Sequence, residues 1–583
     1  MRRSALAVLL AFAGAVSANP VGPTVTAGQA GFQTRGNALT VTNTPGTIIQ
    51  WQGFSIRADE LTRFVQQSAL SAVLNRVTGG NPSEILGRLS SNGRVFLINP
   101  SGITFGAGAQ IDVAGLVASS LHLSDADFLA GRLRFSGNGS EGRVANHGEI
   151  VTPVGGSVAL VAPQIENTGV IRAPSGEIVL AAGSTVRLVD SAFPAIQVEV
   201  SAPKDQPLNL GTLNASGKVF AFLVKQSGVL NASAAGAGDG GRVALKSAGQ
   251  TQVAAGAKIE ANAGSTGRGG EISLAAEEFV HLAGTLEARG GALACDGGRV
   301  ALRSADDALV ASMALIDVSA PLQGHGGEVA LIAQDVMHFA AAIEARGGAR
   351  SGDGGKVEVS GLRTLVFTGR VDTRAPQGRD GMLLLDPTTI KVAAGSTGTP
   401  ANLGDALWGA AEDSGAQTLG AQDLAALLAT TSVTLQATQK IEIAAPVVVA
   451  AAAPRTLTLQ APEIVMQAAV GSTGAALDLR LEAPGGTIDV AAGLEFALGG
   501  GRLAIDAQVA RVAPAELPRV PEAIARSTTP PAEMQALRSQ VQAEIERDNA
   551  RLAAAMKPCG SAGASLKAGC TVASPPRRFT FAG

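Results

Sequence analysis

Residues 91–121, SNGRVFLINPSGITFGAGAQIDVAGLVASSL, decide the fold of this chain. An apolar, strand-like run at 95–98 leads into Asn99-Pro100-Ser101-Gly102, and a second strand pattern starts at Ile103. Proline sets φ at the second position of a turn and glycine frees φ at the fourth, so the tetrapeptide predicts a type I turn between two strands. Beyond this turn, aliphatic residues alternate with small or polar ones, which extends the strand pattern.

This stretch resembles the secretion domain of two-partner secretion exoproteins, the filamentous-haemagglutinin-like family, whose pattern is an Asn-Pro-Asn-Gly-Ile turn. Ser101 departs from that pattern, although serine serves the same turn role. The resemblance covers roughly residues 28–133. It implies that a partner outer-membrane β-barrel transporter bearing POTRA domains recognises the domain and pairs with its unfolded strands. The residues that it assigns to the secretion motif are Asn99, Pro100, Ser101, Gly102 and Ile103.

Length and composition favour an elongated or multidomain β protein. The chain has 583 residues, too many for one compact core. Glycine (73 residues) is about twice its average share of roughly 7%, while the hydrophobic share of 46% excludes a disordered chain. A net charge of -3 argues against nucleic acid as a partner, because phosphate binding needs clustered Lys and Arg.

The first 18 residues predict a secretory signal peptide. Met1-Arg2-Arg3 is a basic start, an apolar run follows from Ala5 to Val16, and small residues precede a cut after Ala18. Twin-arginine export is the minor alternative. No later run reaches the length of a membrane-spanning helix, so we expect a secreted protein without such a helix, either released or held at the outer-membrane surface.

Residues 19–145 are the expected secretion domain and cap of the fold. The part at 19–60 alternates polar and apolar residues between Gly, Asn and Pro, as short strands do. At 59–89 two interpretations stay open. An apolar stripe permits a helix, whereas the family resemblance implies strands and a short insertion outside the main fold. The stripe comprises Leu61, Phe64, Val65, Leu70 and Val73.

Residues 146–380 contain a repeat that predicts a solenoid. Five Gly-Gly pairs recur with spacings of 29, 28, 29 and 28 residues, measured from Gly241 to Gly355. Each unit has room for three short strands, whereas a propeller blade needs four strands and about 40 residues. The prediction is therefore an all-β chain built as a right-handed parallel β-helix, with the secretion domain as its amino-terminal cap.

Charges next to the glycine pairs support this stacking. The residues after the pairs form a charge ladder that alternates in sign: Arg242, Glu271, Arg299, Glu328 and Lys356. The residues before the pairs form a corner column of the opposite phase: Asp239, Arg268, Asp296, His325 and Asp353. Stacked coils place equivalent residues about 4.8 Å apart, a distance at which opposite charges attract. Exposed pairs contribute only about 0.2–1 kcal/mol each, so the ladder indicates register more than stability.

A third set of charges is acidic throughout. We interpret this acidic column as a solvated corner neutralised by Arg289, Arg346 and Arg374, two residues after three of its members. A cation-binding ridge is the less favoured alternative, because calcium needs six to eight converging oxygens. The acidic column consists of Glu260, Glu287, Asp317, Glu344 and Asp372.

The carboxy-terminal third divides into three expected sections. At 381–512 a second β-rich section opens with Leu383-Leu384-Leu385-Asp386-Pro387, which resembles a segment at which the shaft of this family gives way to another section, and residues 423–428 suit a short helix. Residues 513–531 are a Pro-rich linker, and 532–583 combine a helix with a cysteine loop. The helical tail carries an apolar stripe formed by Met534, Leu537, Val541, Ile545, Leu552 and Met556.

Cysteine usage suits an exported chain. Cys559 and Cys570 enclose a small-residue loop and predict a disulfide. This tail resembles that of adhesins in which such a loop stays in the transporter pore and anchors the exoprotein, and a local staple is the alternative. Cys295 lies in a Gly-rich corner and implies no thiol chemistry.

No pattern predicts catalysis, a metal site or a cofactor. The five histidines lack zinc-ligand spacing, and the GxGxxG match at 236–241 lacks the following helix. The last 70 residues show no barrel pattern, so a separate transporter is expected. Adhesion to a host cell or surface receptor is the favoured activity. Haem or iron acquisition, as in haemopexin-binding relatives, is the second hypothesis, and a β-helix enzyme acting on polysaccharide is the third.

Overall fold

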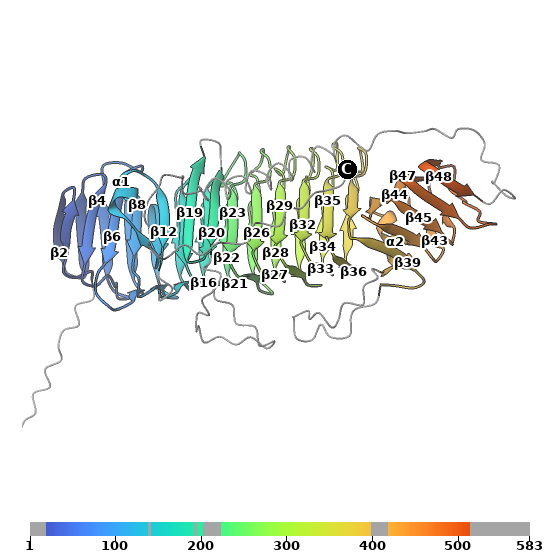
Figure 1. Cartoon of the computed structure of the whole chain (residues 1–583). Helices are drawn as coiled ribbons and strands as arrows, with labels where there is room; N and C mark the ends of the chain where they lie inside the picture. The colour runs from blue at the N-terminus through green and yellow to red at the C-terminus, as the bar shows by residue number, and fades with distance from the viewer. Residues whose placement is uncertain (1–18, 138–140, 192–194, 202–222, 398–417, 513–583) are drawn as a thin grey trace, which may run out of the picture. The chain divides into compact units, whose positions relative to one another are not determined.

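The computed structural model describes residues 19–137, 141–191, 195–201, 223–397 and 418–512, which form a parallel β-helix (Figure 1). The signal peptide, the Pro-rich linker, the tail helix and the Cys559–Cys570 loop expected above lie outside the described residues. Among the helices in the described ranges, none is long and apolar enough to cross a membrane.

Antiparallel strands begin the fold. β1 pairs with β4 and β2 pairs with β3 in antiparallel register, whereas β3, β4, β5 and β6 continue into parallel coils. The elements of this region are β1 (Thr24–Ala27), β2 (Ala30–Arg35), β3 (Ala38–Asn43), β4 (Thr47–Trp51), β5 (Leu61–Val65), β6 (Ala72–Val77), β7 (Ser83–Ile85), β8 (Arg88–Ile98), β9 (Ile103–Phe105) and β10 (Gln110–Ser119).

The helix considered for 59–89 is wrong. Thr62 and Phe64 are buried while Arg63 between them is exposed, which is the period of a strand. Leu70, a member of the expected helical stripe, is 80% exposed. β5, β6 and β7 all pair in parallel with neighbouring coils, and the element outside the solenoid lies elsewhere.

That element is a separate four-stranded antiparallel sheet with a one-turn helix. Its strands come from two distant segments, so β12 pairs with β11 and β19. It packs over its own apolar cluster, which includes Phe96, Phe128 and Phe135. The elements are β11 (His122–Leu123), α1 (Asp125–Leu129), β12 (Leu133–Ser136), β19 (Thr185–Ser191) and β20 (Ala195–Ser201).

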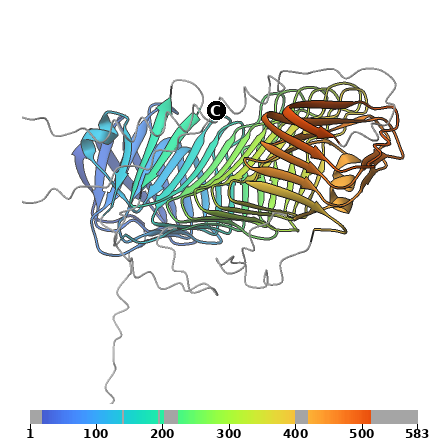
Figure 2. The same ribbon diagram turned by 45° about the vertical axis from the view of Figure 1, so that its right-hand side comes forward.

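Each regular coil contributes three strands, as the repeat predicts, and equivalent strands of successive coils pair in parallel (Figures 1 and 2). The first strands are β15 (Ser157–Ala162), β18 (Glu177–Ala182), β23 (Arg242–Ser247), β26 (Glu271–Ala276), β29 (Arg299–Ser304), β32 (Glu328–Ala333) and β35 (Lys356–Gly361). The second strands are β13 (Val144–Asn146), β16 (Gln164–Asn167), β21 (Leu223–Gln226), β24 (Gln250–Val253), β27 (Phe279–Leu282), β30 (Asp307–Val310), β33 (Val336–Phe339) and β36 (Thr364–Phe367). The third strands are β14 (Glu149–Val151), β17 (Val170–Arg172), β22 (Val229–Asn231), β25 (Lys258–Glu260), β28 (Thr285–Glu287), β31 (Leu315–Asp317), β34 (Ala342–Glu344) and β37 (Arg370–Asp372).

Aliphatic side chains fill the interior of the coils. Ile272, Val300 and Val329 occupy one stacked position and are almost completely buried. Each such side chain contributes about 1.5–3 kcal/mol relative to an exposed one. The Gly-Gly corners bring backbones too close for any side chain, because a Cβ on Gly297 would lie 1.7 Å from the carbonyl oxygen of Val318. Glycine is required there for close backbone approach.

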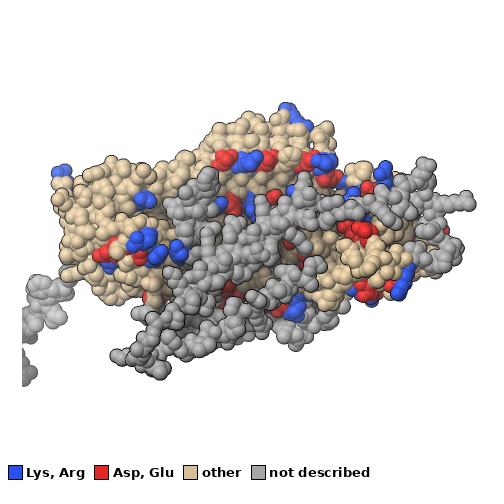
Figure 3. All heavy atoms as spheres, turned by 45° about the horizontal axis from the view of Figure 1, so that its top comes forward, with Lys and Arg blue, Asp and Glu red and all other residues tan. Residues whose placement is uncertain are grey.

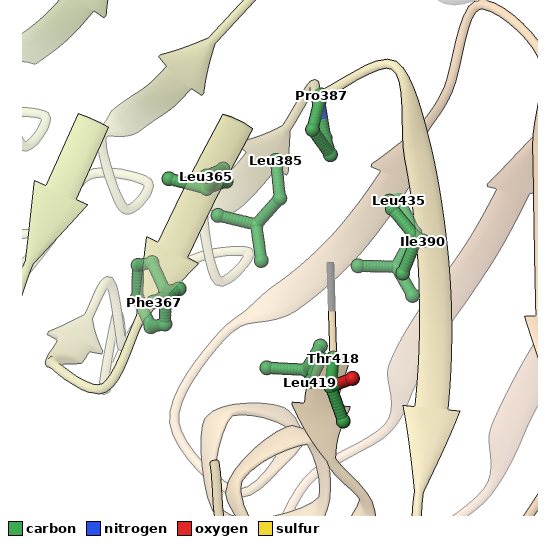
Figure 4. A pocket seen from close by; sticks show the side chains of 8 residues that line it. All are labelled: Leu365, Phe367, Leu385, Pro387, Ile390, Thr418, Leu419 and Leu435. Carbon is green, nitrogen blue, oxygen red and sulfur yellow. The ribbon is translucent and has the colours of Figure 1, made fainter. Parts of the chain in front are cut away.

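The Leu-Leu-Leu segment continues the coil instead of interrupting it. β38 (Met382–Leu385) pairs in parallel register with β35 and with β41. What ends here is the column of second strands, because β36 is the last member of that sheet. Beside it lies an apolar cavity of about 20 Å³, lined by Leu365, Phe367, Ile390 and Leu419 among others (Figure 4).

The remaining coils are built on two main strand columns. The short helix expected at 423–428 is confirmed as α2, which starts two residues earlier. Buried Arg455 forms an ion pair with Asp380 across 75 residues and ties this section to the preceding coils. The elements are β39 (Thr389–Ala393), β40 (Thr418–Gly420), α2 (Ala421–Leu428), β41 (Ser432–Gln436), β42 (Lys440–Ile443), β43 (Val447–Val449), β44 (Arg455–Gln460), β45 (Glu463–Met466), β46 (Val470–Ser472), β47 (Leu477–Val490) and β48 (Leu503–Val512).

Candidate functional site

The turn between β8 and β9 has the hydrogen bond of a β-turn. The N–H of Gly102 donates to the carbonyl oxygen of Asn99 over 2.9 Å. The side chain of Asn99 is fully buried. Its amide donates to the carbonyl oxygen of Asn81 (3.0 Å) and to Oγ of Ser83 (2.9 Å), and its Oδ1 accepts from the N–H of Ser101 (3.0 Å). Asn99 therefore fastens the turn to the coil before it.

Ser101 and Pro100 extend these contacts to both sides. Oγ of Ser101 donates to the carbonyl oxygen of Gly80 over 3.0 Å, so serine at the departing position keeps a structural contact. The carbonyl oxygen of Pro100 accepts from the N–H of Gly142 over 2.8 Å. Gly102 has φ of 104°, a value that favours glycine. The turn is thus bonded to the preceding and the following coil.

Ile103 completes the corner from inside the solenoid. It is 1% exposed and lies between Ser83 of β7 and Val144 of β13 in parallel register. Within the motif only Pro100 is exposed and Ser101 is partly so. The motif is therefore a corner that is bonded to the coils before and after it. Little of its surface is exposed.

The separate sheet next to this corner is fixed by polar contacts as well as by its apolar cluster. Arg76 on β6 pairs with Asp125 over 2.6 Å and donates to the carbonyl oxygen of Leu123 over 2.6 Å. Ser124 caps α1 by accepting from the N–H of Asp127 over 3.1 Å. Hydrogen bonds from Arg132 and Ser124 lower the pKa of Asp127.

A buried amide stack runs through three coils and has no counterpart in the predictions. Nδ2 of Asn146 donates to Oδ1 of Asn167 over 2.7 Å, and Nδ2 of Asn167 donates to Oε1 of Gln226 over 2.8 Å. All three side chains are fully buried. Each is followed two residues later by glycine, in NHG, NTG and QSG, and this recurrence is the signal that could have revealed the stack.

The charge ladder has the register that its alternation favours. Arg242 lies opposite Glu271, which lies opposite Arg299, and the order continues through Glu328 to Lys356. Arg242 and Glu271 form an ion pair. Glu177 stands opposite Arg242 and adds one rung before the five expected residues. Figure 3 shows charged side chains of both signs in rows on the face that it displays.

The acids of the corner column accept hydrogen bonds from backbone N–H groups of the next coil, in addition to facing residues of opposite charge. Oδ1 of Asp239 accepts from the N–H of Arg268, and Oδ1 of Asp296 accepts from the N–H of His325, each over 2.8 Å. Asp353 accepts from the N–H of Arg379 over 2.8 Å, and this bond is the main cause that lowers the pKa of Asp353. Each acid thus holds the next coil at this corner.

The acidic column is a stack of carboxylates with basic side chains beside it. Glu260, Glu287 and Asp317 lie directly opposite one another in successive coils. Lys258 contacts Glu260 at 2.6 Å and Glu287 at 3.4 Å, and the bond to Glu260 raises the pKa of Lys258. The interpretation as a neutralised corner agrees with three further pairings: Arg289 with Asp317 (3.3 Å), Arg346 with Asp372 (3.9 Å) and Arg374 with Asp372 (2.6 Å).

A cluster of three acids and a buried histidine lie outside the turn and the charged columns. Asp306, Asp307 and Asp335 bring carboxylate oxygens within 4.8 Å of one another, but Asp335 pairs with Arg363 and Asp307 accepts from the N–H of Val336. His338 is 3% exposed, and burial lowers its pKa to about 4, so that it is neutral at physiological pH.

Comparison with known proteins finds a matching family model and two similar relatives. A family model described as the TPS secretion domain matches residues 17–278. A heme/hemopexin-binding protein of Haemophilus influenzae is 34% identical over 241 residues, 36% of this chain and 26% of the relative. A second heme/hemopexin-binding protein from that species is 43% identical over 75 residues, 13% of this chain and 8% of the relative. This chain therefore spans about a quarter or less of either relative.

Among the solved structures that match this chain is a secretion domain with a related fold. The HMW1 secretion domain from Haemophilus influenzae shares 26% identity and a TM-score of 0.52, over 63% of this chain and 95% of that domain. The family match extends beyond the separate sheet into the regular coils, as far as residue 278.

Proposed function

We propose that this chain, whose residues 17–278 match the TPS secretion domain, is an exoprotein of two-partner secretion that acts outside the cell as an adhesin-like protein. The domain implies export through a partner outer-membrane transporter. We propose that POTRA domains of this transporter receive the unfolded strands by strand pairing. Cleavage after Ala18, and retention at the surface through Cys559 and Cys570, are further parts of the proposal.

The contacts of Asn99 are the observation that carries the export proposal. Its side chain joins the turn to Asn81 and Ser83 of the preceding coil, so the corner can form only when that coil is in place. We propose that coils then add outside the cell, each using the edge of the previous one. Folding on the outer side would oppose backward movement of the chain. We further propose 19–145 as the part that starts this process, with 146–380 as shaft and 381–512 as a second β section.

Substitution of Asn99 tests the role of the corner. Asn99→Ala removes three hydrogen bonds of about 1 kcal/mol each. We expect a large loss of exoprotein from the culture medium when this variant is produced together with the transporter. Asn167→Ala is the matched control, because it removes an equally buried, hydrogen-bonded amide outside the turn. Equal secretion of both variants would refute a special role for the turn.

Adhesion needs a separate test, because the relatives are matched over only part of their length. Purified mature protein should bind cell surfaces, and a non-reducing gel would show whether the Cys559–Cys570 bridge forms. The relatives' names favour haem or haemopexin binding as the second candidate. Titration with haem, followed by its absorption spectrum, distinguishes the two: a saturable shift without cell binding would favour the second candidate over adhesion.

A further inference from the structure

The last described coil ends in an open strand edge. β48 pairs with β47 on one side, and among the described strands none pairs with its other side. Figure 2 shows these strands in red at the end of the described chain. The first coils differ, because β1 and β2 there pair in antiparallel fashion with β4 and β3. An unpaired edge of ten residues is a template for strand addition.

Apolar side chains at this edge are incompletely covered. Leu479 and Leu481 on β47 are fully buried, whereas Leu503 and Ile505, which lie opposite them on β48, are only partly buried. Phe496 is also partly buried against the same core. Covering such side chains removes apolar surface from water, which favours association. The edge therefore favours a partner with an apolar inner face.

The charges on β48 favour a partner that brings a cation to one position. Asp506 lies opposite Glu482, so two acids face each other at a position where the two preceding coils carry Gln460 and Gln436. Burial raises the pKa of Glu482, the charge of Arg480 opposes this shift, and the charge of Asp506 adds to it. Five residues later, Arg511 lies opposite Asp489. β48 thus carries an acid that faces an acid of β47 and, five residues later on the same strand, a cation.

We propose that β48 pairs in antiparallel register with β48 of a second copy of this chain, so that two solenoids join at their last described coils. The pairing is centred between Gln508 and Val509. It places Asp506 opposite Arg511 of the second copy, and the two-fold axis generates the same pair again. Each Asp506 then has an acid on one side and a cation on the other.

In this register, the side chains of β48 that point toward the core of one solenoid adjoin those that point toward the core of the other. β47 pairs with β44 up to Glu482 and with β45 from Thr487, so a corner between two strand columns lies between Ala507 and Val509 of β48, where the pairing register shifts. Ala507 lies opposite buried Ala483 before the corner, and Ala510 lies opposite buried Ile488 after it. Both positions therefore belong to the core side. The proposed register sets Ala507 opposite Ala510 of the second copy, so core-side positions adjoin core-side positions.

Charge reversal and charge exchange test this pairing in the mature full-length chain. Sedimentation velocity should show a dimer for the native protein. Asp506→Arg or Arg511→Asp alone should weaken dimerisation by about tenfold or more, because both symmetric pairs become repulsive. The double exchange D506R/R511D should restore the dimer, since opposite charges then face each other again. Arg63→Asp, an exposed reversal on β5, is the control and should leave the dimer intact.

Hydrogen exchange at the backbone amides of residues 503–512 shows whether β48 is paired, and so distinguishes the proposed dimer from the alternatives. The proposal predicts slow exchange in the dimer and faster exchange in the single-reversal variants. A monomer with slow exchange would mean that the chain itself covers β48, and a monomer with fast exchange would mean that the edge stays open; either result overturns the proposal. If both single-reversal variants dimerise as strongly as the native protein, the contact lies on another surface, and this result also overturns the proposal.

Discussion

Removing one coil, compared with removing two, tests whether the alternating charges specify how coils stack. Deletion of 268–295 removes one coil of 28 residues and joins Gly267 to Asp296. It brings Arg299 next to Arg242 and Asp296 next to Asp239, so both columns place like charges together. Deletion of 268–324 removes two coils, 57 residues, and brings Glu328 next to Arg242, which keeps the alternation.

The expected difference follows from the pairs that are lost. The native neighbours are the Arg242–Glu271 ion pair and the Arg268–Asp296 pair at 3.9 Å. If each attraction is worth about 0.5 kcal/mol and each repulsion the same, the one-coil deletion loses roughly 2 kcal/mol that the two-coil deletion keeps. Inner side chains and Gly-Gly corners stay in register in both variants, so packing does not favour either.

Urea unfolding at low and high salt measures this difference. Salt screens exposed charges, so the difference in stability between the two-coil and the one-coil variant should shrink as salt rises. The change of this difference with salt decides the question, because the packing that is lost with the removed coils is not screened by salt. Equal salt responses in both deletions would refute the reasoning.

Three further predictions concern single residues. Asp380→Asn should lower the free energy of unfolding by about 3–5 kcal/mol, because Arg455, whose side chain is 2% exposed, loses its charged partner; adding Arg455→Met should recover part of the loss in urea unfolding, and no recovery would contradict this account. Cys295→Gly should stabilise the chain by about 1 kcal/mol, because Cys295 has φ of 96° in a column otherwise occupied by glycine; Cys295→Ser should not, and a destabilised glycine variant would argue against strain. Because burial lowers the pKa of His338 to about 4 from 6.5, the unfolded chain binds a proton that the folded chain does not; stability should therefore fall by about 3 kcal/mol as the pH drops from 6.5 to 4, and a His338→Leu variant with the same pH profile would contradict this.

The regular coils could be predicted because their information is local and repeated. Gly-Gly pairs at nearly constant spacing determine which residues stack, and the charge ladder checks that register independently. The turn at Asn99 could be predicted because proline and glycine restrict the backbone themselves. That Asn99 is buried could not, since its partners Asn81 and Ser83 come from another coil.

Other features depend on residues that lie far apart in the sequence. The rung formed by Glu177 is separated from Arg242 by 65 residues, so no constant period reveals it. The separate antiparallel sheet joins β12 to β19, and no local pattern links these strands. At 61–65 the same apolar residues fit a helix or a strand, and only the neighbouring coils decide between them.

The glycine corners also predict how this protein can vary over evolution. Every amino acid that replaces glycine adds at least a Cβ, and at Gly269, Gly297, Gly326 and Gly354 that atom would lie within 2.2 Å of a backbone carbonyl oxygen. A point mutation at these codons that changes the residue is therefore harmful whichever residue it introduces. The neighbouring ladder positions follow another rule, because paired exchanges of sign preserve the attraction. Orthologues should thus keep the glycines unchanged while the charges beside them change in pairs.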